Sequence, residues 1–156
     1  MIREIEELSM NAWPSLQTKL YDGWVLRFSD GYTKRANSVS PIYECTILLD
    51  EKIDLCEKEY GLRNLTILFK LTSESNPEGI DARLEERGYI RDNETSLRIL
   101  DLSQYVCHES QGINVEEKYS DAWLKGFFSC SNISDEKIKL AARRILDNIL
   151  IKIVNL

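Results

Sequence analysis

Three polar side chains that could bind a ligand lie close together in the first quarter of the chain: Arg35, Asn37 and Ser38. A guanidinium group can hold a carboxylate through two parallel hydrogen bonds, and amide or hydroxyl groups beside it can add further contacts. If these side chains line a cleft, they form a candidate site for a substrate carboxylate or amide, with Arg35 as its principal group.

A predicted hairpin positions this cluster. The dipeptide Asp30-Gly31 lies between two alternating stretches and is typical of a two-residue turn, because both central positions of that turn need a positive φ. Counting outward from such a turn places Arg35 opposite Leu26 and Asn37 opposite Trp24, on one face of the hairpin.

The same polar residues have a structural interpretation. Arg35 would then pair with a carboxylate from the first helix, and Asn37 would satisfy backbone groups at a bulge or a module junction. The residue pattern leaves the cleft and the structural interpretation open. Lys34 and Arg27 fall on the opposite face of the predicted hairpin, where we expect them to be exposed.

Composition excludes several classes of function. The 156 residues include 20 basic and 26 acidic side chains, and a net charge of −6 gives no electrostatic basis for binding nucleic acid. No apolar run is long enough to span a membrane, so a cytoplasmic location is expected. The only histidine is His108, and the cysteines (Cys45, Cys56, Cys107 and Cys130) form no C-x-x-C pair, so we expect reduced structural thiols and no metal site.

The rest of the first hundred residues predicts alternating helices and strands. An apolar stripe from Ile2 to Ala12 predicts a short helix that Pro14 would end or bend. A second stripe from Leu49 to Tyr60 predicts a helix within 48–61, with Gly61 as a left-handed C-cap. Asn76 is the expected N-cap of a third helix, with Pro77 in its first position and Gly88 beyond its last turn. Short apolar runs predict strands over 65–71 and 95–102.

A polar stretch over 104–112 is the predicted linker. Beyond it, Ser134 is the expected cap of a helix that runs toward Leu156 and carries Asp135 and Glu136 in its first turn. An apolar stripe along this helix widens near the end, so its last turns should be buried on all sides or switch to a strand. The stripe consists of Ile138, Ala142, Ile145, Ile149, Ile153 and Leu156.

Several of these motifs resemble the GNAT superfamily of acyl-CoA-dependent N-acetyltransferases. The order of elements from 53 to 102 is similar to the later half of that fold, and LEERGYI over 84–90 resembles the family's helix ending. AWP over 12–14, the string DGWVLRFSDGYTKRANSVSPI over 22–42 and YGLRNLTI over 60–67 resemble the amino-terminal half of two-domain bacterial members.

The resemblance implies acetyl transfer from acetyl-CoA to a small-molecule amine. Members of the superfamily hold the cofactor diphosphate on backbone N–H groups of a glycine-containing turn at a helix N-terminus. The corresponding turn here, within residues 38–53, has no glycine and carries bulky Tyr43 and Ile47 with acidic Glu44 and Asp50 nearby. The sequence therefore identifies no cofactor-binding residue.

The family's thiolate donor, often a tyrosine, has no clear counterpart. Tyr89 follows the Arg87-Gly88 pair, where it resembles the family's packing aromatic, so we expect it to pack. Glutamates such as Glu57 are expected on solvated helix faces. The catalytic residues therefore stay unassigned.

We expect an α+β fold with a GNAT-like, mixed and mostly antiparallel sheet flanked by helices and followed by a helical extension. The expected division is a degenerate module over 1–103, the linker, and the beginning of a second module or a dimerisation helix over 113–156. The predicted role is that of an amino-terminal, non-catalytic module, truncated before the catalytic half and partnered by a missing C-terminal module. The alternative is a scaffold that forms a homodimer through the helix 134–156. A third possibility is that the hairpin cleft binds an acyl-CoA or a small acidic ligand.

Overall fold

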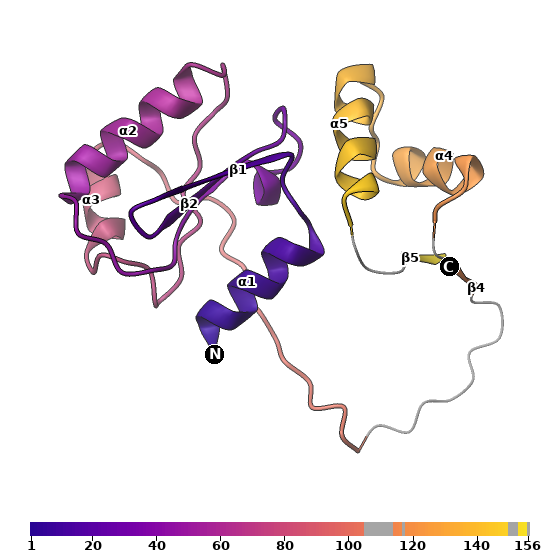
Figure 1. Cartoon of the computed structure of the whole chain (residues 1–156), viewed down its shortest axis with the longest axis horizontal. Coiled ribbons are helices and arrows are strands. Elements are labelled where there is room, and N and C mark those ends of the chain that lie inside the picture. The colour runs from indigo at the N-terminus through magenta and orange to yellow at the C-terminus, as the bar shows by residue number, and fades with distance from the viewer. Residues whose placement is uncertain (105–113, 117, 150–152, 156) are drawn as a thin grey trace.

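The computed structural model describes residues 1–104, 114–116, 118–149 and 153–155. The expected α+β fold is confirmed. Strands β1 (Gln17–Tyr21), β2 (Trp24–Phe28) and β3 (Val39–Pro41) form an antiparallel sheet in the order β1-β2-β3 (Figure 1). One parallel bridge, from Val39 to Phe69, makes the sheet mixed.

The tight hairpin lies one Asp-Gly pair earlier than predicted. Tyr21 of β1 pairs with Trp24 of β2, so the two-residue turn between them is Asp22-Gly23. Both turn residues have positive φ values, 41° and 81°, as this type of turn requires. Strand β1 was not among the elements predicted from the residue pattern.

The predicted turn at Asp30-Gly31 also forms, but no strand returns from it. The φ values there are 53° and 85°, and the Tyr32 amide donates to the Ser29 carbonyl at 2.9 Å. The chain then enters a short 3-10 helix, η1 (Lys34–Ala36), before β3 begins.

The predicted register of the returning strand is therefore wrong. Leu26 pairs with Val39 and Trp24 pairs with Pro41, instead of with Arg35 and Asn37. The physical reason is that one face of β2 is apolar and buried, so the sheet selects a partner strand that carries an apolar residue toward the same face.

Helices α1 (Ile2–Ala12) and α2 (Leu49–Gly61) form where the apolar stripes predict helices. Their ends differ in detail from the prediction. Gly61 is not a left-handed cap, because right-handed Leu62 follows it and Asn64 takes the positive φ of 53°.

Helix α3 (Ile80–Glu86) begins later than predicted. Gly79, with a φ of 84°, precedes it as N-cap, and Asn76 does not cap it. The carbonyl of Asn76 instead accepts a hydrogen bond of 2.8 Å from the Trp24 indole, so this residue ties the loop to the sheet. Gly88 lies beyond the last turn with a φ of 86°, as expected.

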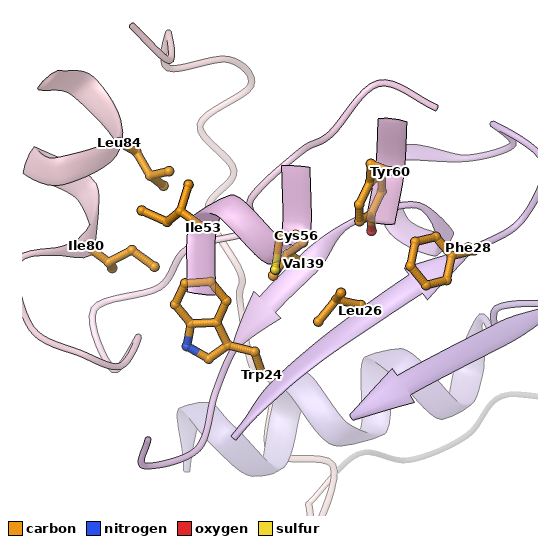
Figure 2. Packing of buried hydrophobic residues seen from close by; sticks show 9 residues of the cluster. All are labelled: Trp24, Leu26, Phe28, Val39, Ile53, Cys56, Tyr60, Ile80 and Leu84. Carbon is orange, nitrogen blue, oxygen red and sulfur yellow. The ribbon is translucent and has the colours of Figure 1, made fainter. Parts of the chain in front are cut away.

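The main core lies between the sheet and helices α2 and α3 (Figure 2). Helix α1 lies against the other face of the sheet, where Glu6 forms a salt bridge with Lys70 at 2.5 Å. The buried cluster consists of Trp24, Leu26, Phe28, Val39, Ile53, Cys56, Tyr60, Ile80 and Leu84.

Of the two other predicted strands, one forms a single bridge and the other does not form. Within 65–71, Leu68 and Lys70 each exchange one backbone hydrogen bond of 2.8 Å with Val39, and a single bridge results. Residues 95–102 form no strand, and Ile99 and Leu100 are 63% and 73% exposed. Apolar pattern alone does not make a strand, because each strand also needs a hydrogen-bonding neighbour.

The C-terminal part contains β4 (Asn114–Glu116), α4 (Asp121–Cys130), α5 (Glu136–Asp147) and β5 (Ile153–Asn155), with β4 antiparallel to β5. The helix predicted over 134–156 is thus shorter, and of the two alternatives left open for its end, the structure has the strand. Asp135, and not Ser134, is its N-cap, because the Asp135 carboxylate accepts from the amides of Lys137 and Ile138.

The apolar face of α5 is largely covered by the chain itself. Ile145 is 0% exposed and Ala142 is equally buried. An aspartate at position 145 is therefore expected to disrupt this helix whether or not the protein forms a dimer. Residues 105–113 lie outside the described part, so the linker over 104–112 and the division into modules stay predictions.

No helix in the described part of the chain is both long and apolar enough to cross a membrane.

Candidate functional site

Asn37 holds the second Asp-Gly turn together. Its side-chain Oδ1 accepts hydrogen bonds from the backbone amides of Ser29 at 2.7 Å and Gly31 at 3.2 Å, and its Nδ2 donates to the Thr33 carbonyl at 2.9 Å. The side chain is buried, and all three contacts are with backbone of one loop. For Asn37, these contacts support the structural interpretation.

Arg35, Asn37 and Ser38 do not form one cluster in the folded protein. Ser38 is fully buried, whereas the Arg35 side chain is exposed on η1. Arg35 lines a shallow surface depression of about 390 Å³ together with Trp13, Thr33 and Lys34. The structure therefore separates the one exposed member of the predicted trio from its two buried neighbours.

Arg27 is the buried arginine, and the expectation that it is exposed is wrong. Only 5% exposed, its guanidinium donates to the carbonyls of Arg35 at 2.6 Å, Met10 at 3.4 Å and Trp13. Burial lowers the pKa of Arg27, and the nearby Tyr60 and Glu6 oppose that shift. Its role is to join α1, β2 and η1. Lys34, by contrast, is exposed as expected.

A hydrogen-bonded polar cluster forms around Asp22 at the loop that precedes α2. The Asp22 carboxylate accepts hydrogen bonds from the backbone amides of Thr46, at 2.9 Å, and Ile47, also at 2.9 Å. The Thr46 hydroxyl donates to it at 2.9 Å and the Lys52 ammonium at 3.0 Å. These donors, with the Ile47 amide as the largest cause, hold the pKa of Asp22 well below its usual range, although burial opposes them.

Lys52 brings a positive charge into the protein interior. Its side chain is 0% exposed, and its Nζ lies 4.5 Å from the centroid of the Trp24 ring. Besides the Asp22 carboxylate, the ammonium donates to the Asp22 carbonyl. A buried ammonium needs an anionic partner, because its desolvation is costly when it is unpaired.

Gly23 lets the turn approach this loop closely. A Cβ at position 23 would collide with the carbonyl oxygen of Glu44 and lie 2.7 Å from that of Tyr43. The Tyr43 amide donates to the Gly23 carbonyl at 3.0 Å. The hairpin turn is thereby clamped against residues 43–47, and Asp22 is directed at their amides.

Sequence reasoning missed Asp22, Lys52 and Arg27. The sequence does contain a sign of the role of Asp22, because Asp22-Gly23 is a second Asp-Gly dipeptide and an apolar strand follows it. Lys52 lies four residues before Cys56 and adjoins the apolar face of α2, which is a weaker signal. Arg27 alternates with apolar neighbours as an exposed strand residue would, so its burial leaves no mark in the pattern.

The turn before α2 does not fit a cofactor diphosphate. Acetyl-CoA is implied by the family motifs, and its diphosphate would need the amides of this loop. Two of these amides already bind the Asp22 carboxylate, and Glu44 in the same loop adds a further negative charge, whereas Asp50 is paired with Arg83. An incoming diphosphate would therefore meet like charge and occupied donors.

Tyr89 packs as expected. Its ring centroid lies 5.4 Å from that of Phe69, and its hydroxyl donates to Glu57 at 2.9 Å.

Burial raises the pKa of Cys56 to about 12, so this thiol is not activated as a nucleophile. No cluster of three potential metal ligands occurs among the described residues.

Comparisons with known proteins identify relatives. Residues 1–140 match the family described as "Probable histone acetyltransferase Rv0428c C-terminal". The chain is also 29% identical over 145 residues to the "Uncharacterized N-acetyltransferase YobR" of Bacillus subtilis (strain 168), in an alignment that covers 88% of this chain and 56% of that protein. The chain thus spans little more than half the length of this curated relative. No solved structure matches it significantly.

The family match includes both Asp-Gly turns and helices α1 to α4, nearly all of the described structure. The GNAT-like acetyltransferase relationship expected from the motifs is confirmed, and this chain belongs to that acetyltransferase family.

Proposed function

We propose that these 156 residues form an amino-terminal, non-catalytic module of an acetyltransferase, with little acetyl transfer of their own. The main support for the proposal is that the Asp22 carboxylate accepts hydrogen bonds from the amides of Thr46 and Ile47, which a cofactor diphosphate would need. In this proposal, another part of the enzyme transfers the acetyl group from acetyl-CoA to an amine.

The charge around this loop supports the proposal. Asp22 is paired with the fully buried Lys52, so a diphosphate would have to displace a carboxylate that an interior ammonium requires. The hairpin turn also fills the space beside the loop, where Gly23 leaves no room even for a Cβ. A bulky ligand can enter only if the hairpin moves away.

Isothermal titration of the folded 156-residue chain with acetyl-CoA tests the proposal. We expect no saturable heat at millimolar acetyl-CoA, and circular dichroism of the same sample establishes that the chain is folded. Saturable binding in the micromolar range would contradict a non-catalytic module, because it would require a cofactor site.

Arg35 supports a second candidate function, the binding of a small acidic ligand in the depression that it shares with Trp13. Arg35 is exposed, and together with Trp13 it lines an open hollow of about 390 Å³. Acyl-CoA phosphates and small carboxylates both carry the negative charge that such a group attracts.

Arg35→Ala separates the two candidates. If the wild-type chain binds acetyl-CoA and Arg35→Ala abolishes that binding while the chain stays folded, the depression is the site. Arg91→Ala is the matched control, because Arg91 is an exposed arginine in another part of the same region, paired with Asp81. Equal binding by both variants would exclude the depression.

A further inference from the structure

The Asp22 carboxylate occupies a site with the features of an anion-binding cavity. Four donor groups converge on it: the amides of Thr46 and Ile47, the Thr46 hydroxyl and the Lys52 ammonium, all at 2.9–3.1 Å. Only 16% of the Asp22 side chain is exposed. Most aspartates in turns bond to neighbouring backbone, whereas this one binds groups 24 to 30 residues away.

Lys52 is the independent sign that the position demands an anion. Its side chain is completely buried, and the Asp22 carboxylate is its only anionic partner among the described residues. The rings of Trp24 and Tyr21 cover the ammonium, with centroids 4.5 and 6.0 Å from Nζ. Without a carboxylate the ammonium would keep only the residue-22 carbonyl and these aromatic faces, which do not neutralise it.

We propose that the position filled by the Asp22 carboxylate is a binding site for a small carboxylate, whose resident ligand is the chain's own side chain. When residue 22 has no side chain, a free carboxylate ion of the same size occupies the site and restores the charge balance of Lys52. Formate is the matching probe, because it carries the same planar pair of oxygens as the Asp22 carboxylate.

Asp22→Gly opens the site with the least disturbance of the backbone. Residue 22 has a φ of 41°, and glycine adopts this conformation without strain. Asp22→Asn is the matched control, because asparagine fills the same volume without the charge and leaves no room for formate. Asp22→Ser is a second opening variant, in case the glycine variant does not fold.

Thermal unfolding of each variant is measured in sodium formate and in sodium chloride at equal concentration. We expect Asp22→Gly to melt below the wild type in chloride and to regain roughly 3–5 °C in formate at tenfold its dissociation constant. The rise should saturate with formate concentration. The wild type and Asp22→Asn should show no rise beyond that in chloride.

The proposal is overturned if neither Asp22→Gly nor Asp22→Ser gains stability from formate beyond the chloride control, or if Asp22→Asn gains as much. These outcomes are independent of the acetyl-CoA titration, which uses the wild-type chain. A wild type that binds acetyl-CoA together with a formate response in Asp22→Gly would reject the proposed function and keep the anion site.

Discussion

The chain contains two Asp-Gly turns, at 22–23 and 30–31, in which both residues adopt positive φ values, yet the turns do different things. Asp22-Gly23 closes a two-residue hairpin, and its carboxylate lies against a loop and a buried lysine. Asp30-Gly31 leads into a 3-10 helix, and its half-exposed carboxylate pairs with Arg144 of α5 at 3.2 Å. A similar local conformation therefore supports an interior anion in one case and a surface ion pair in the other.

The difference teaches that the turn dipeptide specifies backbone geometry, while the surroundings specify its energetic importance. At the first turn, carbonyl groups of Tyr43 and Glu44 crowd the glycine. At the second, a Cβ added to Gly31 would have Leu65 Cδ2 as its nearest neighbour at 3.8 Å, an ordinary contact. Substitutions at equivalent positions of the two turns should therefore have unequal effects.

Gly23→Ala should have the largest effect. The added Cβ would collide with the Glu44 carbonyl and come within 2.7 Å of that of Tyr43, at a backbone φ of 81°. We expect a loss of about 3 kcal/mol in the free energy of unfolding, measured by urea denaturation. Gly31→Ala, with backbone strain alone, should lose about 1 kcal/mol. Equal losses would remove the proposed difference between the turns.

Asp22→Asn should have the next largest effect at neutral pH, and the effect should depend on pH. The pKa of Asp22 is lowered in the folded protein, so its contribution is fully present above the unfolded value of about 3.9. That contribution is lost as the pH falls toward the folded pKa. The difference in unfolding free energy between wild type and Asp22→Asn should therefore shrink from about pH 5 to about pH 2 in denaturation experiments; a constant difference would contradict it.

Asn37→Ala should weaken the second turn by about 2 kcal/mol, because the buried amide of Ser29 and the more exposed amide of Gly31 would lose their acceptor. Hydrogen exchange should reveal faster exchange of these two amides, with little change at Thr46 and Ile47. Asn11→Ala is a suitable control, because Asn11 is exposed in the regular helix α1. Unchanged protection at Ser29 would argue against this role of Asn37.

Asp30→Asn should have the smallest effect, within about 0.5 kcal/mol. Its ion pair with Arg144 is between side chains that are 50% and 55% exposed, and water and salt screen such pairs. Urea denaturation of Asp30→Asn and of Arg144→Ala should give midpoints close to the wild type. A loss near that of Asp22→Asn would mean that the carboxylates of the two turns are equally important.

Much of the helical structure was predictable from the residues. The presence and location of α1 and α2 follow from apolar periodicity, and both Asp-Gly pairs adopt the positive φ values that the dipeptide favours. The register of the hairpin was not predictable from the residues, because two Asp-Gly pairs compete for the turn. Only packing against α2 selects Val39 as the partner of Leu26. The binding role of Arg35, Asn37 and Ser38 stays a prediction, and the structure exposes Arg35 while it buries Asn37 and Ser38.

Local sequence thus accounts for the features that depend on near neighbours along the chain: helix faces, left-handed turns and the absence of a glycine before α2. The burial of Asp22, Arg27 and Lys52 depends on groups 8 to 30 residues away, which only the folded chain brings together. The free energy of a charged side chain is set by its partners and its exposure to water. For that reason the anion site in front of α2 emerges from the tertiary contacts, although the Asp-Gly turn that supplies its carboxylate is visible in the sequence.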